Sequence, residues 1–324
     1  MPAAPAERTR RRSCVSGVRL HLLAARNGYR RGLQYRAAHM VNNLASAVFG
    51  FVYIAVWRAA LAGAPATSPR TVAHGSGATG LAARGPIAPV TVASGLTAPG
   101  PGIPGSPPTA HPAALGLTPG GMAHYIALAQ CLMWLTTFLP YGLGVPAAVR
   151  TGQVVADLLR PAAFWPLQMA REAGAAAYSL LYRSLPMAAV FALAVGFPLP
   201  PSAGAAAAGT AAVALGVWNA LCLNYLVGVS AFWTTEARAA HWLLQSLILS
   251  CGGGTIPLRA FPAALAAVLR WLPFASLLST PVLAWTGSSV RPDLLVSAGW
   301  AAALGCLCTC LTAAARRRLE VQGG

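Results

Sequence analysis

Side chains able to carry acid–base or ion-coupled chemistry are few in this sequence. Only six aspartates and glutamates occur among its 324 residues. They are Glu7, Asp157, Glu172, Glu236, Asp293 and Glu320. None lies near the centre of a long apolar run, where proton- or sodium-coupled carriers commonly hold acidic residues. This placement argues against an ion-coupled carrier that acts alone, although it does not eliminate one.

Histidine and cysteine show no pattern typical of a metal site. The six histidines have no H-E-x-x-H or similar ligand spacing. Three of the seven cysteines, Cys306, Cys308 and Cys310, alternate along an apolar run. On a helix Cys306 and Cys310 share a face and Cys308 points elsewhere, which is poor geometry for a metal. We therefore expect no catalytic residue, metal or cofactor in this chain.

The chain cannot hydrolyse ATP through a P-loop. That motif, G-x-x-x-x-G-K-[ST], needs a lysine, and all 23 basic residues here are arginine. If the protein does work with chemical energy, the energy must come from a partner or from an ion gradient.

A polar stretch in the middle of the chain holds the most informative pattern. It reads Arg150-Thr-Gly-Gln-Val-Val-Ala-Asp-Leu-Leu-Arg-Pro161. Its apolar members are Val154, Val155, Leu158 and Leu159, with Asp157 and Arg160 beside them. The spacing predicts a short amphipathic helix that ends at the proline. Such a helix can lie on a membrane or dock into a groove on a soluble partner.

The composition indicates what kind of secondary structure holds the residues discussed above. The chain is 56% hydrophobic and only 9% charged, and its mean hydropathy is +0.59. Soluble domains carry about 25% charged residues, so much of this surface must face lipid. We predict an all-α polytopic membrane protein, because helices satisfy every backbone hydrogen bond within one segment.

Long apolar runs predict six transmembrane helices. The predicted spans are 37–57, 122–143, 174–197, 205–232, 242–256 and 294–315. Residues 257–290 contain apolar pieces too short to cross a bilayer, broken by Pro257, Pro262, Pro273 and Pro281. They predict re-entrant or interfacial helices between the fifth and sixth spans.

The segments outside the spans differ in character. Residues 1–36 predict a basic tail followed by an amphipathic interfacial helix, and residues 61–120 a low-complexity loop rich in proline and glycine. Residues 149–172 form a polar loop, and residues 316–324 a short tail.

Arginine distribution predicts the orientation. Sixteen arginines lie in the two tails, the 149–172 loop and the link between the fourth and fifth spans, against six on the other side. The positive-inside rule then places both termini in the cytosol, with the 61–120 loop outside. The same clustering at span ends fits membrane lipid headgroups better than nucleic acid, so we expect no nucleic-acid partner despite a net charge of +17.

Arg183 is the one basic residue well inside a predicted span. We favour a side chain that extends toward the cytosolic headgroups. An ion pair with Glu172 or Asp157 is the alternative.

Short motifs along the chain resemble the permease subunits of type-2 ABC transporters (the ABC-2 family), in particular a bacterial, exporter-like branch. The first group comprises Leu33-Gln-Tyr-Arg-Ala-Ala38, Tyr125-Ile-Ala-Leu-Ala-Gln130, Gly152 with Asp157-Leu-Leu-Arg-Pro161, Arg171-Glu-Ala-Gly174, and Arg183 to Pro186. The second comprises Asn224-Tyr-Leu-Val-Gly228, Phe232-Trp-Thr-Thr-Glu236, Ile256-Pro-Leu258, Phe261-Pro262, Trp271-Leu-Pro-Phe-Ala275, Thr280-Pro281 and Arg318-Leu-Glu-Val-Gln-Gly-Gly324. Their order and spacing extend over most of the chain. The departure is the 61–120 loop, which is longer and richer in proline and glycine than the family pattern.

The resemblance implies a transport function in the bacterial cytoplasmic membrane. This chain would form the translocation path of an ATP-driven exporter, paired with a second permease, identical or related. ATP and magnesium would be bound by separate ABC ATPase subunits. The 149–172 loop would be the coupling element, with Arg150, Gly152, Asp157, Leu158, Leu159, Arg160 and Pro161 as its candidate residues. Pro257, Pro262, Pro273, Phe274 and Pro281 would shape the re-entrant segment. The alternatives are an ion-coupled carrier and a non-transporting membrane scaffold or resistance factor.

Overall fold

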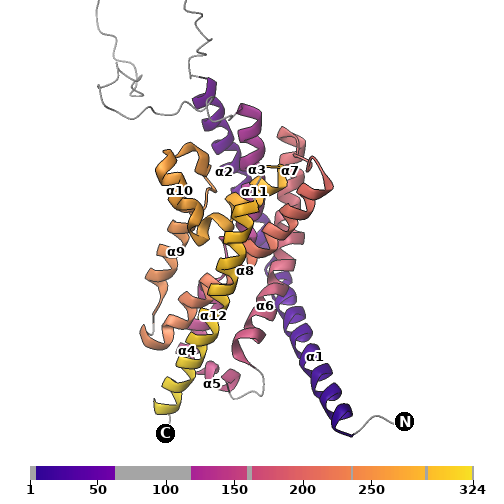
Figure 1. Cartoon of the computed structure of the whole chain (residues 1–324), viewed down its shortest axis with the longest axis vertical. Helices are drawn as coiled ribbons and strands as arrows, with labels where there is room; N and C mark the ends of the chain where they lie inside the picture. Colours follow the sequence, from indigo (N-terminus) through magenta and orange to yellow (C-terminus); the bar gives the residue numbers. More distant parts are fainter. Residues whose placement is uncertain (1–4, 63–117, 159–162, 235, 289–290, 323–324) are drawn as a thin grey trace, which may run out of the picture.

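The computed structural model describes residues 5–62, 118–158, 163–234, 236–288 and 291–322 (Figure 1). Most of the predicted 61–120 loop therefore lies outside the described residues. So do Leu159, Arg160 and Pro161 of the predicted coupling helix.

Every regular element in the described residues is a helix, which confirms the all-α prediction. The long helices are α1 (Pro5–Gln34), α2 (Arg36–Ala62), α3 (Pro119–Thr136), α6 (Phe164–Ser179) with its continuation α7 (Leu185–Val195), α8 (Ala203–Thr234) and α12 (Arg291–Gln322). The shorter α-helices are α4 (Val145–Arg150), α5 (Gln153–Leu158), α9 (Arg238–Cys251), α10 (Ala263–Trp271) and α11 (Ser279–Trp285).

Within the described residues, five helical segments are long and apolar enough to cross a membrane. They are Arg36–Ala62, Pro119–Arg150, Phe164–Val195, Ala203–Thr234 and Arg291–Arg318. They overlap five of the six predicted spans. Two contain irregular turns: η2 (Tyr141–Gly144) joins α3 to α4, and the π-helical turn η3 (Leu180–Ser184) joins α6 to α7.

The predicted fifth span at 242–256 is not such a helix. The chain there forms α9, which has 14 residues and ends before Gly252 and Gly253. At 1.5 Å per residue α9 is about 21 Å long, too short for a hydrocarbon layer of about 30 Å. The apolar run was counted through glycines that end the helix, so the count of six is not confirmed.

α3 and α8 form the centre of the bundle. In the most apolar part of each span, 72% of residues are buried in Pro119–Arg150 and 56% in Ala203–Thr234, against 17% in Arg36–Ala62 and 22% in Arg291–Arg318. Small residues on α8 allow close packing. A Cβ on Gly216, for example, would lie 2.6 Å from the carbonyl oxygen of Ser276.

The proline-broken segment folds into short pieces beside α8 and α12. These are η4 (Leu258–Ala260), α10, η5 (Pro273–Ser276) and α11. Pro257 and Pro262 precede η4 and α10, and Pro273 begins η5, where a missing N–H costs no helical hydrogen bond. Pro281 and Phe274 belong to α11 and η5. Whether these short helices re-enter a membrane stays a prediction.

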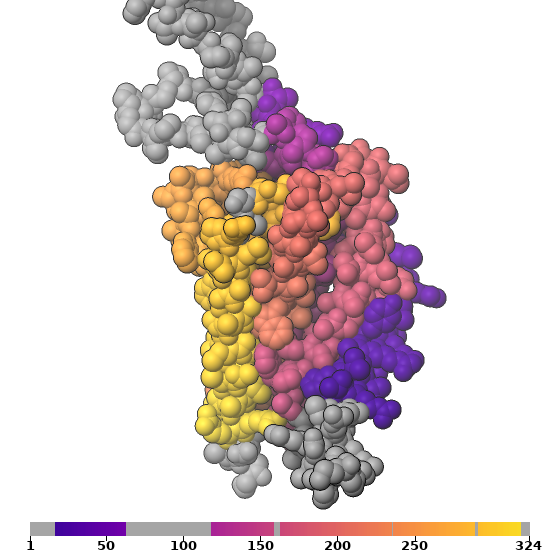
Figure 2. Space-filling view, turned by 45° about the vertical axis from the view of Figure 1, so that its right-hand side comes forward, coloured from indigo at the N-terminus to yellow at the C-terminus, as the bar shows by residue number. Residues whose placement is uncertain are grey.

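α1 lies alongside α6 as a long helix (Figures 1 and 2). The two backbones approach so closely that a Cβ on Gly28 would overlap the carbonyl oxygen of Arg171, and one on Gly174 that of Ala25. Val18 and Leu22, part of the predicted apolar stripe, are exposed. Their position at a membrane interface stays a prediction.

Both ends of the described chain lie at one end of the bundle, together with α4 and α5 (Figure 1). We call this the terminal end. The opposite end holds α10, α11 and the start of α12.

Candidate coupling site at the terminal end

A left-handed turn sets the direction of the candidate coupling element. Gly142, Leu143 and Gly144 have φ values of +50°, +53° and +80° and form the turn between α3 and α4. Gly142 packs on α8, and a Cβ on Gly228 would lie 2.2 Å from the Gly142 carbonyl oxygen. Two glycines are therefore required where this turn crosses α8.

Gly152 separates the two short helices that follow the turn. Its φ of +72° is in the left-handed region, which favours glycine, and no neighbouring atom limits its space. Arg150 ends α4, and α5 follows as a separate short helix containing Asp157 and Leu158.

The apolar face of α5 packs inward, against its own protein. Val154 is 1% exposed and joins a core cluster with Leu143 and Phe164, and Leu158 packs against the same cluster. Of the apolar side chains predicted to dock, only Val155, at 48% exposed, is both described and on the surface. The hydrophobic spacing of α5 therefore marks mainly the side of the helix that packs against this protein's own core.

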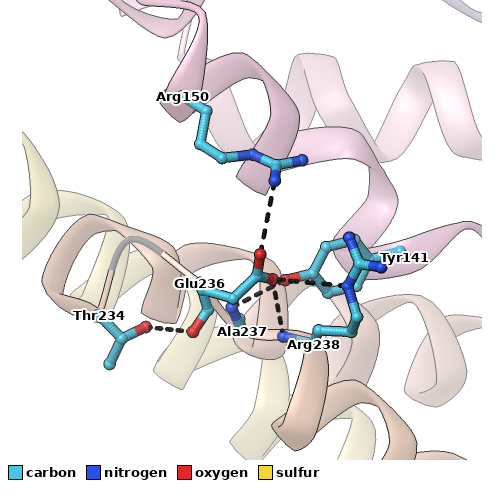
Figure 3. A network of polar contacts seen from close by, with 6 residues as sticks. All are labelled: Tyr141, Arg150, Thr234, Glu236, Ala237 and Arg238. Atoms are coloured by element: carbon cyan, nitrogen blue, oxygen red, sulfur yellow. Dashed lines mark hydrogen bonds and ion pairs between the residues drawn. The ribbon is translucent and has the colours of Figure 1, made fainter.

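Glu236 joins two loops at this end (Figure 3). The Tyr141 hydroxyl donates to Glu236 Oε1 at 2.6 Å and accepts from the Ala237 N–H at 2.8 Å. Arg150 donates to Glu236 Oε2 at 3.4 Å. The Arg238 N–H donates to Oε1 at 3.1 Å. The link after α8 is thus attached to both ends of the η2–α4 turn.

These donors lower the pKa of Glu236. The hydrogen bond from Tyr141 is the largest cause, and the Arg238 N–H with the charges of Arg238 and Arg150 add to it. All of them favour the carboxylate over the neutral acid. Glu236 is therefore an anion at neutral pH, held in place by its neighbours.

A second acidic residue connects the turn to α6 and α1. Glu172 is only 1% exposed, and Arg31 donates to its two oxygens at 2.9 and 3.2 Å. Gln168 donates to Glu172 Oε1 at 3.3 Å and to the Leu143 carbonyl oxygen at 2.8 Å. The left-handed turn is therefore attached to α1 through two buried side chains of α6.

Sequence reasoning did not find either network. Arg31 and Glu172 are 141 residues apart, and Tyr141 and Glu236 are 95 apart. The available signal was that Glu172 and Glu236 lie in two links expected on the arginine-rich side of the spans.

A hollow of 230 Å³ opens between α5 and the α1–α6 pair. It is smaller than a typical small-molecule pocket of about 300–1,000 Å³. Its polar lining includes Arg31, Thr151, Gln153, Asp157 and Arg171. Of the candidate coupling residues, Asp157 thus faces this hollow, and Arg150 contacts Glu236 across the turn.

The residues predicted to shape the re-entrant segment lie at the opposite end and take no part in this site. Near them, Arg270 of α10 makes a bidentate ion pair with Asp293 of α12 at 2.9 and 3.1 Å.

The alternative prediction for Arg183, an ion pair with Glu172 or Asp157, is wrong, and the extension of its side chain toward the cytosolic headgroups stays a prediction. The residue is 9% exposed and its guanidinium lies over the Trp134 ring, 4.0 Å from the centroid. Glu172 binds Arg31 instead, and among the described residues Arg183 has no ion-pair partner. Among the described residues it therefore pairs with neither Glu172 nor Asp157.

No group of three or more histidine, cysteine or acidic residues could hold a metal ion in the described part of the chain.

The comparison with protein families decides the identity. Residues 120–323 match the model of the ABC-2 family transporter proteins, which is more than half of the chain. The chain belongs to the ABC-2 transporter family. No curated protein and no solved structure gives a significant match.

The ABC-2 match begins at α3 and extends through α12, so it includes the η2 turn, α4, α5 and Glu236. Membership confirms the resemblance to ABC-2 permeases and identifies this chain as a multi-pass membrane permease component, while the bacterial, exporter-like branch stays a prediction. Its region before α3, with α1 and α2, lies outside the match.

Proposed function

We propose that this ABC-2 protein is the permease subunit of an ATP-driven exporter in a bacterial cytoplasmic membrane. The ATPase is a separate chain that binds ATP and magnesium, and a second permease, identical or related, completes the translocation path. Both termini and the α4–α5 segment face the cytosol. The absence of lysine, and hence of a P-loop, supports a separate ATPase.

The main observation behind the proposal is that α5 is held in place by apolar packing on its inner face. Val154 anchors the helix from inside, while Val155 and its neighbours Gln153 and Ala156 are exposed at the terminal end. A helix that is rigidly held on one face and open on the other is suited to dock on a soluble partner.

The contacts of the turn give a path for movement. A push on α5 would reach α8 through the Gly142–Gly228 crossing and the link after α8 through Arg150 and Glu236. It would reach α6 and α1 through Gln168 and Glu172. ATP-driven displacement of α5 would thereby move several helices at once.

The first experiment is co-purification from gently solubilised membranes with mass spectrometry of the recovered partners. We expect an ABC ATPase in near-equal amount with the wild type. Val155→Arg should reduce its recovery about tenfold, equivalent to about 1.4 kcal/mol of binding, because a charge enters the docking surface. Val268→Arg is the matched control, since Val268 is an exposed valine of α10 at the opposite end.

Asp157→Arg and Leu158→Arg test the same surface with residues that also support α5. We expect reduced ATPase association or transport in a protein that still inserts. Recovery of the ATPase at wild-type level in the Val155 variant would contradict the assignment of α5. Gradient-driven transport in proteoliposomes without ATP would instead support an ion-coupled carrier.

A further inference from the structure

Arg183 lies in the part of its span that must be within the membrane. A crossing needs about 20 residues, and every stretch of that length within Phe164–Val195 includes position 183. The same reasoning places Trp134 and Thr137 within the membrane, because every such stretch of Pro119–Arg150 includes them. A charged residue at this depth is costly and usually marks a functional site.

No acid in the described part of the chain compensates this charge. Glu172 is bound by Arg31, Glu236 by Arg150 and Arg238, and Asp293 by Arg270. Contact with the Trp134 ring offsets part of the cost of burying the guanidinium. The buried Nε still has no acceptor within hydrogen-bond distance.

Two further donors without partners lie near the end of α3, where the Trp134 ring contacts Arg183. They are the indole Nε1 of Trp134 and the hydroxyl of Thr137, both buried. Residues 134 and 137 are three apart and share one face of α3. A guanidinium over the Trp134 ring, together with two donors three residues apart, matches a ligand that is anionic and accepts several hydrogen bonds.

The backbone at Arg183 is also unusual. Residues Leu180–Ser184 form a π-helical turn between α6 and α7. Such turns occur frequently at functional sites. The neighbouring polar residue Asn43 of α2 donates to the Tyr182 carbonyl oxygen of this turn at 3.1 Å, so a third helix contacts the same place.

We infer that Arg183, Trp134 and Thr137 form a binding site for the phosphate or carboxylate group of an anionic amphiphile. Arg183 supplies the charge and a planar set of donors that fits either group. The apolar part of the ligand would lie along the exposed side chains of Leu180, Leu181 and Leu185. The ligand is either a resident acidic lipid or a transported compound. The inference rests on membrane insertion alone and stands whether or not an ATPase partner is found.

The test measures retention of two probes by purified protein in detergent, followed by native mass spectrometry. The lipid probe is phosphatidylglycerol in competition with phosphatidylcholine. The probe for a transported compound is dodecyl phosphate in competition with dodecanol. We expect the wild type to retain one anionic probe at least tenfold over its uncharged or zwitterionic competitor, and Arg183→Gln to lose this preference.

Arg58→Gln is the matched control, because Arg58 is an exposed arginine near the end of α2. Trp134→Phe and Thr137→Val keep the shape of the site and remove one donor each, so each should lower the preference several-fold. They keep the inference testable if Arg183→Gln does not fold. Arg183→Lys should retain part of the preference, since it keeps the charge without the planar donors.

Preference for phosphatidylglycerol would identify a resident lipid, and preference for dodecyl phosphate alone would identify a transported compound. Equal retention by wild type and the Arg183→Gln, Trp134→Phe and Thr137→Val variants, or no preference in either arm, would overturn the inference. A cross-link from position 183 to an acidic residue of a second permease copy would overturn it too, because the cation would then be a subunit contact.

Discussion

The two ends of this bundle are held together by different forces. At the terminal end, Glu236 and Glu172 organise networks of charged and polar hydrogen bonds around the η2 turn. At the opposite end, Leu277, Leu278 and Val282 are buried in apolar clusters. The polar contacts there include the ion pair of Arg270 with Asp293 and hydrogen bonds to backbone carbonyl groups, as in the Tyr125 hydroxyl donating to the Gly253 carbonyl oxygen at 2.7 Å.

This difference corresponds to what each end is proposed to do. Hydrogen bonds between side chains at a partly exposed surface contribute modestly and can exchange partners. Buried apolar packing is lost in large steps when it is disturbed. The terminal end is therefore built to rearrange when a partner moves it, and the opposite end to keep its shape.

The largest effect at the terminal end is expected from a steric clash where the η2 turn crosses α8. Gly228→Val would put side-chain atoms within the backbone of Gly142, whose carbonyl oxygen lies 2.2 Å from the Cβ position. We expect destabilisation by more than about 4 kcal/mol, measured by thermal unfolding in detergent. Gly299→Val on α12 is the control, because no atom lies within 4 Å of its Cβ position. A near-native unfolding temperature for Gly228→Val would show that α8 and the turn separate easily.

A smaller loss of stability is expected when a side chain is removed from the core of the opposite end. Leu278→Ala removes a completely buried side chain next to α3 and α9. Cavity formation should destabilise the protein by about 2–4 kcal/mol, and this loss should be the same at pH 4 as at pH 7 because no titratable group is removed. Leu265→Ala, at an exposed leucine of α10, is the matched control. A pH-dependent loss would contradict the division between the two ends.

The smallest change in stability is expected for Glu236→Gln, and this change should depend on pH. Its pKa is lower in the folded protein than the ordinary value of 4.5. The carboxylate therefore stabilises the fold above that value, and this contribution is lost as pH falls through the folded pKa. The difference in unfolding temperature between wild type and Glu236→Gln should be constant above about pH 5.5 and shrink below about pH 4.5. A difference that stays constant to about pH 3 would show that the lowered pKa does not contribute to stability.

Much of this protein follows from its sequence alone. Low charge and long apolar runs determine a membrane-embedded helical chain, because only helices or closed barrels satisfy the backbone in lipid. Five spans were found because their apolar runs are long enough to cross a membrane, although irregular turns interrupt two of them. The prolines at 257, 262 and 273 marked true breaks, since proline restricts where a helix can begin. The motif series identified the family, which the match over residues 120–323 confirms.

Other features were decided by the tertiary structure. The spacing of Val154 and Val155 shows that α5 has an apolar side, but not whether that side faces a partner or the protein's own core. The alternative of an ion pair between Arg183 and Glu172 was wrong, because charge pairing depends on which helices lie side by side. Sequence gives the residue types and their local period, whereas contacts between residues more than a hundred positions apart exist only once the helices have packed.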